Sequence, residues 1–305
     1  MFALIIEKNT AMIKVSIIIL NWNRKDFLKI CLNSLKEQTL KDFEVILVDN
    51  GSVDTSQEFV KSNFPEVKLI ELDKNHGVPG AINIGIKEAL NNPEGKYIVL
   101  LNNDTKANPY WLKKLVKAAN SAENEKVGIF SPKILRMDNP QILDSAGLIF
   151  KNGYIQERGH GEIDKGQFDN KINIIGACGA ACLYKRKMLE EIGLLREEFF
   201  AYYEDSEFSW RAWKNGWKAK FVPDAIIYHK GRATTYQNEE IAKKFKTLDY
   251  KNLVWTVRNY GTYKNKILLT LVFAKGMFAH WIRVCKINPD WKIKLYYKSI
   301  IDLWS

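Results

Sequence analysis

Short apolar runs rich in β-branched residues recur in the first third of the chain, at residues 15–20, 44–48, 67–72 and 97–101. The stretches between them carry apolar residues at intervals of three and four, as at Leu28, Leu32 and Leu35 or at Ile82 and Ile86. Buried strands that alternate with amphipathic helices are typical of parallel sheets with crossover helices. The pattern therefore predicts an α/β fold in which helices flank a Rossmann-like, mostly parallel central sheet.

Polar loops follow all four runs. They read Asn21-Trp22-Asn23-Arg24, Asp49-Asn50-Gly51-Ser52-Val53-Asp54, Asn75-His76-Gly77 and Asn102-Asn103-Asp104. Turn chemistry alone would explain any one of these loops, because Asn, Asp and Gly are ordinary turn residues. Four such loops at the carboxyl edge of one parallel sheet favour a shared ligand crevice instead. The sequence has no Gly-x-Gly-x-x-Gly after the first run and no Walker-type loop, which argues against a dinucleotide oxidoreductase or a P-loop enzyme.

Two later segments carry further candidate chemistry. Residues 176–181 are small enough to let the backbone approach a ligand or another strand closely, and tight packing is the open alternative. An aromatic run then leads to Glu204, Asp205 and Glu207 at the start of a helical stretch. A carboxylate at a helix start is commonly a cap, which accounts for Glu207. The other two carboxylates indicate a functional site.

The positive charge is concentrated at the C-terminal end. The net charge is +11, but residues 241–305 hold 13 Lys or Arg against three Asp, so residues 1–240 are close to neutral. Residues 267–282 are apolar apart from Thr270, Lys275 and His280. A helix of that length reaches about 24 Å, short of the roughly 30 Å hydrocarbon core of a membrane. We therefore expect an α/β domain at 1–240, followed by a basic, aromatic helical tail at 241–305 that lies on an anionic membrane surface without spanning it.

Aromatic rings suited to the headgroup level recur through this tail, at Trp255, Tyr260, Tyr263, Trp281, Trp291, Tyr296, Tyr297 and Trp304. Two other roles stay open, a helical subdomain that packs on the first domain and a homodimer contact. Lysines interleaved with aromatic residues also occur in nucleic-acid-binding proteins, but the apolar run at 268–274 is unsuited to a solvated groove.

The cysteines bear on the cellular compartment. Cys31, Cys178, Cys182 and Cys285 are too few and too scattered for a disulfide framework. We expect them to be structural thiols, buried in a protein of the reducing cytoplasm.

In their order along the chain, these motifs resemble a family 2 glycosyltransferase of the GT-A fold, in the branch that includes rhamnosyltransferases and other cell-surface glycan enzymes. The resemblance covers residues 15–231. It rests on the four polar loops with Asn83, on Tyr203-Glu204-Asp205 and on Tyr228-His229. Each motif alone is weakly specific, and their order and spacing together carry the resemblance.

The resemblance implies a role for each motif. Asp205 would be the base that takes the proton of the acceptor hydroxyl, and Glu204 would orient the acceptor or its loop. Asp104 and His229 would hold a divalent cation, Mg²⁺ or Mn²⁺, that neutralises the donor diphosphate. The donor-binding residues would be Asn21, Asn23, Asp49, Asp54, Asn75, Gly77, Asn83 and Asn103. In this set Asp49 would accept a hydrogen bond from the imide N–H of uracil or thymine, while a helix N-cap is an equally supported role for Asp54.

One position departs from the family pattern. The Asp-x-Asp motif appears here as Asn102-Asn103-Asp104, so that an amide replaces the first carboxylate. A less anionic site holds a cation less tightly and leaves more of its coordination to the diphosphate.

The resemblance implies an inverting hexosyl- or deoxyhexosyltransferase that moves a sugar from a UDP- or dTDP-sugar to a glycan or lipid-linked glycan. Such an enzyme would serve cell-surface polysaccharide or glycoconjugate synthesis, peripherally bound to the inner face of the cell membrane. A sugar nucleotidyltransferase is the alternative with a similar fold, but residues 21–24 lack the Gly-rich loop that those enzymes carry after the first strand. Nucleic-acid binding through the basic tail is the weaker alternative from another class.

Overall fold

The computed structural model describes residues 14–231, 239–284 and 291–305. Its strands are β1 (Val15–Asn21), β2 (Phe43–Asp49), β3 (Lys68–Glu71), β4 (Tyr97–Asn102), β5 (Thr105–Ala107), β6 (Val127–Arg136), β7 (Leu143–Ser145), β8 (Leu148–Lys151), β9 (Tyr154–Glu157), β10 (Asn173–Ile174), β11 (Ala181–Lys185) and β12 (Lys218–His229). Its helices are α1 (Lys25–Lys36), α2 (Ser56–Asn63), α3 (Gly77–Leu90), α4 (Trp111–Ser121), α5 (Arg186–Ile192), the 3₁₀ helix η1 (Glu197–Phe199), α6 (Glu204–Lys214), α7 (Glu239–Tyr260), α8 (Tyr263–Val284) and α9 (Trp291–Trp304).

The central sheet combines a parallel half and a mixed half. Its order is β10-β12-β6-β11-β4-β1-β2-β3, with β5 beside β12 and β7 beside β6. The neighbours among β3, β2, β1 and β4 are parallel, as the alternation of apolar runs and helical stripes predicts. β11 then enters antiparallel between β4 and β6, and β12 pairs in parallel with β6. A separate hairpin is formed by β8 and β9.

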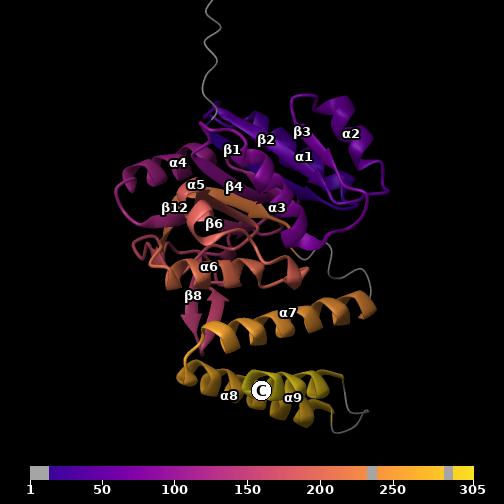
Figure 1. Cartoon of the computed structure of the whole chain (residues 1–305), viewed down its shortest axis with the longest axis vertical. Coiled ribbons are helices and arrows are strands. Elements are labelled where there is room, and N and C mark those ends of the chain that lie inside the picture. Colours follow the sequence, from indigo (N-terminus) through magenta and orange to yellow (C-terminus); the bar gives the residue numbers. More distant parts are fainter. Residues whose placement is uncertain (1–13, 232–238, 285–290) are drawn as a thin grey trace, which may run out of the picture.

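Helices cover both faces of the sheet (Figure 1). Side chains alternate along β1, so that Ile17 and Ile19 join the apolar cluster with α1 and α4, while Ile18 joins the cluster with α3, α5 and α6. A strand buried on both faces is apolar throughout rather than alternating, which explains the continuous run in the sequence. The predicted stripe of the first crossover helix, represented by Leu28 and Leu32, is buried against the first of these faces.

The first tail helix, α7, packs on the α/β domain. It lies below α6 in Figure 1, and α8 and α9 form the layer farthest from the sheet. Leu253, Val254 and Val257 of α7 share one apolar cluster with Ile155 of β9 and Trp210 of α6. Burial of each such aliphatic side chain contributes roughly 1.5–3 kcal/mol. This part of the tail is therefore a packed element of the domain rather than a separable membrane segment.

The aromatic residues of the tail divide into two groups. Tyr263, Tyr297 and Trp304 are exposed. Trp255, Tyr260, Trp291 and Tyr296 are half-buried, and Trp255, Tyr260 and Tyr296 pack against Phe199, Trp210 and Tyr250, respectively. The Trp281 side chain and Cys285 lie outside the described residues. Within the described part of the chain, no helix combines the length and the apolar character needed to cross a membrane.

Candidate active site

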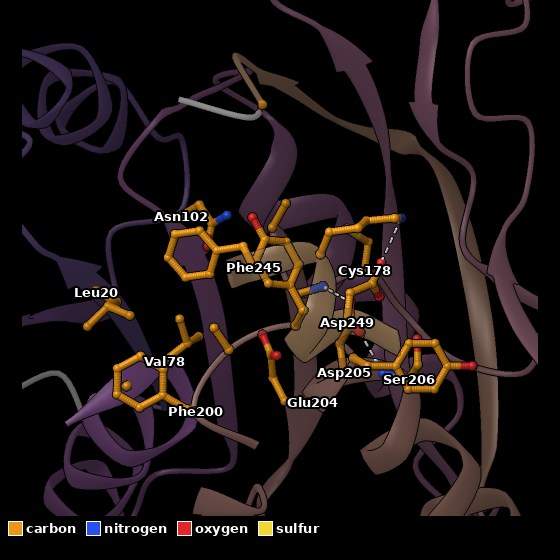
Figure 2. A pocket seen from close by; sticks show the side chains of 18 of the residues that line it. Leu20, Val78, Asn102, Cys178, Phe200, Glu204, Asp205, Ser206, Phe245 and Asp249 are labelled. Carbon is orange, nitrogen blue, oxygen red and sulfur yellow. Dashed lines mark hydrogen bonds and ion pairs between the residues drawn. The ribbon is translucent and has the colours of Figure 1, made fainter. Parts of the chain in front are cut away.

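The polar loops meet around one cavity of about 2000 Å³. One wall consists of residues at the carboxyl ends of the parallel strands, including Trp22, Asn75 and Asn103. The opposite wall comes from β9, from the loop before α6, and from α7 and α9. Figure 2 shows Glu204 and Phe245 projecting into this space between the two walls. The predicted crevice is thus present, but part of its wall comes from β9, α7 and α9, which were not predicted to line it.

A chain of side-chain hydrogen bonds joins three strand ends. Asn21 and Asp49 are neighbours in the register of β1 and β2. The Nδ2 of Asn21 donates to Oδ2 of Asp49 at 2.9 Å, and the Nδ2 of Asn103 donates to Oδ1 of Asn21 at 2.7 Å. Asn21 and Asp49 are fully buried, and Trp22 and Arg24 line the cavity beside them. The structure therefore brings together three residues predicted to bind the sugar donor, Asn21, Asp49 and Asn103. Of these three, Asn103 lines the cavity.

Asp49 also organises the loop that follows β2. Its Oδ1 accepts hydrogen bonds from the Ser52 N–H at 2.8 Å and from Gln57 Nε2 at 2.9 Å. Asn23 has a left-handed backbone with φ of 53°, and its Oδ1 accepts from the Val53 N–H at 2.8 Å. The two loops predicted to hold the nucleoside are in this way bound to each other.

Asp54 caps helix starts, which was the alternative to donor binding in the sequence analysis. Its Oδ2 accepts from the N–H of Lys25, the first residue of α1, at 3.0 Å, and its Oδ1 accepts from the N–H of Ser56, the first residue of α2, at 3.2 Å. One carboxylate thereby satisfies a free N–H at the start of each of two helices, where a negative charge is also favoured by the helix dipole. The residue does not line the cavity, and its position supports the loops rather than a donor contact.

Asn83 is likewise placed away from the cavity. Its Nδ2 donates to the Leu195 carbonyl at 2.9 Å and to Glu197 Oε1 at 3.0 Å, while its Oδ1 accepts from the Leu195 N–H at 3.0 Å. Because the amide is buried and occupied at both ends, we replace the predicted donor contact by a role in fixing the loop after α5.

Gly77 lies where the donor side of the cavity touches the loop before α6. Its φ is 76°, and a Cβ atom here would lie 2.6 Å from the Phe200 carbonyl oxygen. The next residue, Val78, donates its N–H to that carbonyl at 2.6 Å. Asn75 holds the turn because its Oδ1 accepts from the Gly77 N–H at 2.8 Å. Only glycine permits both this backbone conformation and this close approach.

The two predicted cation ligands lie side by side. Nε2 of His229, at the end of β12, is 3.2 Å from Oδ1 of Asp104. The other ring nitrogen, Nδ1, is 2.7 Å from Oδ2 of Asp144 in β7. Although burial lowers the pKa of His229, the two carboxylates raise it to about 10. The site therefore favours a positive charge between Asp104 and the ring, and Asp144 holds the ring as carboxylates hold metal-binding histidines elsewhere.

These residues suit a cation that the protein holds only in part. Carboxylate oxygen and imidazole nitrogen both ligate divalent transition metals. The described residues include no group of three or more His, Cys, Asp or Glu side chains placed to hold a metal ion. A cation at Asp104 and His229 would therefore need further ligands, which agrees with the amide at Asn102.

Glu204 and Asp205 open α6 at the cavity wall, after a strained loop. Phe200, Tyr202 and Tyr203 all have left-handed backbone, with φ of 60°, 67° and 70°. Such conformations cost of order 1–3 kcal/mol each and cluster at functional sites. They are held here by the packing and hydrogen bonds of the surrounding chain.

The two carboxyl groups differ in their hydrogen bonds. Asp205 Oδ2 accepts from the Gly179 N–H at 2.8 Å and its Oδ1 accepts from the Ser206 N–H at 2.6 Å. Burial raises the pKa of Asp205, and the hydrogen bonds from these two N–H groups lower it in part. Burial and the charge of Asp205 raise the pKa of Glu204, whose buried Oε2 has no hydrogen-bond partner among the residues that the structure describes. The negative charge of the pair therefore belongs on Asp205, and burial gives that carboxylate more basicity than a helix start alone predicts.

Several residues of the site escaped the sequence analysis. Asp144 reaches His229 only through sheet pairing across 85 positions of the chain. Phe245 and Asp249 of α7 line the cavity, although the tail was predicted to face a membrane. In the small-residue segment at 176–181, Gly176 packs tightly on Ser209, and the Gly179 N–H donates to Asp205. As expected, Cys31, Cys178 and Cys182 are buried free thiols.

A family model for glycosyl transferase family 2 matches residues 16–193 of the chain. The chain belongs to this family. It is 26% identical over 209 residues to the low-salt glycan biosynthesis hexosyltransferase Agl10 of Haloferax volcanii, covering 67% of this chain and 63% of that protein. It is 28% identical over 198 residues to the dTDP-rhamnosyl transferase RfbF of Shigella flexneri, covering 65% and 62%. The matched region thus spans less than two thirds of either relative.

The fold is similar to that of S. aureus TarS, residues 1–349, solved in complex with UDP-GlcNAc. The TM-score is 0.62 at 18% identity, over 95% of this chain and 80% of that one. The predicted GT-A-like architecture is thereby confirmed, with its central sheet, flanking helices and C-terminal helices.

Proposed function

We propose that this glycosyltransferase is an inverting enzyme that transfers a hexose or deoxyhexose from a UDP- or dTDP-sugar to a hydroxyl of a glycan or lipid-linked glycan. The observation that carries the proposal is the position of Asp205. Its buried carboxylate shares one cavity with Asn103, Asp104 and His229, so a base and a diphosphate site face the same space. A nucleotidyltransferase has no need of a base on the acceptor side, and that alternative gains no support.

The reaction forms one bond at the anomeric carbon and breaks another on its opposite face. Asp205 takes the proton of the acceptor hydroxyl while that oxygen attacks the anomeric carbon from the face opposite the diphosphate. The bond from the anomeric carbon to the diphosphate oxygen breaks, and the nucleoside diphosphate leaves with the electron pair. Glu204, protonated beside its charged neighbour, donates a hydrogen bond to the acceptor or its loop.

Asp104 and His229 would hold the Mg²⁺ or Mn²⁺ ion, with Asp144 fixing the imidazole. Such an ion supplies positive charge at the leaving diphosphate. A neutral imidazole is required for ligation, so cation binding should release a proton and strengthen as the pH rises. Asp144→Asn should weaken cation binding by about tenfold, the lower range for loss of a residue that orients a ligand. Titration of Mn²⁺ into the UDP-bound protein, followed by calorimetry, measures this without turnover.

Donor choice rests on Asp49. Its carboxylate offers about four acceptor sites. Three are occupied by Asn21, Ser52 and Gln57, and the carboxylate is fully buried, so the imide N–H of uracil or thymine would reach it by displacing one of these partners. Asn75, Gly77 and Asn103 then face the sugar diphosphate.

A thermal-shift screen tests the donor class. We expect UDP or dTDP to raise the melting temperature in the presence of Mn²⁺ or Mg²⁺, because a ligand that binds only the native state stabilises it. GDP and CMP serve as matched controls. A response to GDP alone would refute the role of Asp49, and no response to any nucleotide would refute the proposed function.

The same enzyme would bind peripherally to the inner face of the cell membrane through α8 and α9. Exposed apolar side chains follow one face of each helix: Tyr263, Ile267, Leu271 and Phe278 on α8, and Tyr297, Ile301 and Trp304 on α9. The two faces meet at Tyr263 and Trp304, whose ring centroids are 5.3 Å apart. Lys264 and Lys275 flank the α8 stripe and suit anionic headgroups.

Flotation with anionic liposomes tests the membrane surface. Removing the whole tail would also remove α7 from the domain core, so point variants are the sharper test. We expect the triple variant Leu271→Ser, Phe278→Ser and Tyr297→Ser to lose vesicle binding. A control variant with Tyr110→Ser and Ile163→Ser, which changes exposed apolar residues of the α/β domain, should float like the parent. Equal flotation of all three proteins would show that α8 and α9 do not bind membranes.

A further inference from the structure

The cavity is larger than the donor requires. Sites for small ligands and cofactors are typically about 300–1,000 Å³, whereas this cavity is about 2000 Å³. The strand-end residues line one part of it, residues of the tail helices α7 and α9 line another, and Asp205 lines the same space. An acceptor whose hydroxyl reaches Asp205 therefore shares the cavity with the donor, and α7 and α9 contribute to the chemistry around it.

Lysines dominate this acceptor side. Five of them line the cavity, Lys243, Lys244 and Lys246 from α7 and Lys292 and Lys294 from α9. Lys246 is paired with Asp249 at 3.1 Å. Among the described residues, no carboxylate lies within ion-pair distance of the other four, so that part of the chain does not balance their positive charge locally.

The charges of the two helices converge on one aromatic ring. The ammonium groups of Lys243 and Lys292 lie 5.7 and 5.8 Å from the ring centroid of Trp291, which also lines the cavity. Other lysines of the same helices, Lys251 and Lys298, do not line it. The concentration of charge therefore follows the cavity wall rather than the overall basicity of the tail.

The cavity thus combines the base with an excess of positive charge. Asp205 and Asp249 line it, Lys246 pairs with Asp249, and the other four lysines line it without a carboxylate partner among the described residues. A ligand that matches these groups has a neutral hydroxyl-bearing part at Asp205 and an anionic part at the lysines. Phosphate is the anion best suited to several converging ammonium groups, because each can donate to it and add charge.

We propose that the lysines of α7 and α9 form a phosphate subsite, and that the natural acceptor carries a phosphate or diphosphate next to the sugar or polyol that is glycosylated. This inference rests on the proposed function, because it takes Asp205 as the point where the acceptor hydroxyl lies. The phosphate belongs either to a lipid-linked glycan or to a soluble polyol phosphate chain, which share this chemistry.

Binding to the full-length protein, saturated with UDP and Mn²⁺, tests the subsite. One probe is a short glycerol phosphate oligomer, measured by calorimetry against glycerol oligomers without phosphate. The other is a neutral phosphatidylcholine vesicle with a few per cent polyprenyl phosphate, measured against the same vesicle without it. Binding of either phosphate probe above its control supports the subsite, and the responding probe identifies the source of the phosphate.

Charge-matched variants locate the binding. Lys243→Ser with Lys244→Ser, and Lys292→Ser with Lys294→Ser, should each weaken binding of the responding phosphate probe about tenfold or more, since each lysine adds favourable energy with an anion at a surface. The control, Lys251→Ser with Lys298→Ser, removes equal charge from the same helices outside the cavity and should bind as the parent does.

The outcomes separate the two proposals. Equal losses in all three double variants, or no preference for phosphate in either probe, would overturn the subsite and leave only general electrostatic attraction. Retained UDP binding in the variants shows that they are folded and that the donor site is intact. Absence of UDP binding in the parent protein would instead refute the proposed function.

Discussion

Asn252 joins the tail to the loop that precedes the proposed catalytic carboxylates, and its replacement is the most direct test of that coupling. Its buried Nδ2 lies 3.0 Å from the Phe199 carbonyl, 3.0 Å from that of Ala201 and 2.8 Å from that of Tyr202. Asn252→Ala removes the donor and leaves these carbonyls without it. Because an unsatisfied buried acceptor costs about 1–3 kcal/mol, we expect roughly 2–4 kcal/mol of lost unfolding free energy.

The same change should lower turnover. The loop contains three left-handed residues whose strain must be held by surrounding contacts. When the loop relaxes, the carboxylate of Asp205 shifts, and a misplacement of about 1 Å costs on the order of a hundredfold in rate. UDP binding should persist, because the strand ends that hold the donor are unchanged.

The assay combines urea unfolding, sugar transfer and the UDP-induced thermal shift. Asn259→Ala is the matched control, since Asn259 lies on the same helix but is exposed, and its side chain donates to the Trp255 carbonyl of the preceding turn at 2.7 Å. If Asn252→Ala and Asn259→Ala unfold at the same urea concentration and turn over equally, α7 does not hold the catalytic loop.

Further changes test individual groups. Asp205→Asn should keep donor binding and lower turnover at least about a hundredfold, and a matching loss of donor affinity would place Asp205 in the cation site instead. Because burial raises the pKa of Asp205, turnover of the parent should fall on acidification well above pH 4, and an acid limb near pH 4 would contradict this. Asp104→Ala should abolish cation-dependent donor binding and His229→Ala should weaken it, whereas activity unchanged by EDTA would remove both assignments. A hydrogen bond to Glu157 raises the pKa of His160 to about 9, so the protonated ring stabilises the fold fully below about pH 6.5 and the contribution is lost as the pH rises toward 9. His160→Gln should lose this pH dependence of the urea midpoint, and an unchanged dependence would assign it to another group.

The parallel half of the fold was predictable because its signals are local. Each strand from β1 to β4 is one short apolar run, and each crossover helix repeats its apolar residues at helical spacing. The Asn21, Asp49 and Asn103 cluster follows from this half alone, since parallel strands bring their carboxyl ends to one edge. These predictions needed no knowledge of distant contacts.

The remainder depends on pairing between distant segments. Asp144 meets His229 only because β7 and β12 both pair with β6, which no periodicity reveals. Asn83 looks like a ligand-binding amide in sequence, yet Leu195 and Glu197 take up its hydrogen bonds. The basic tail was detected by composition, but composition does not distinguish lysines on a cavity wall from lysines on a membrane-facing surface.

Because α7 and α9 line the cavity, two separate regions of the sequence encode its walls. The strand ends proposed to bind the nucleotide are encoded before residue 110, whereas the part of the far wall that α7 and α9 form is encoded after residue 238. Under the proposed function, substitutions in the C-terminal helices would redirect the enzyme to a new acceptor without altering its donor. The freedom is limited by Asn252 and Val257, because these positions must still fit the catalytic loop and the domain core. Diversification of glycan structures through such enzymes would then proceed mainly by change at the end of the chain.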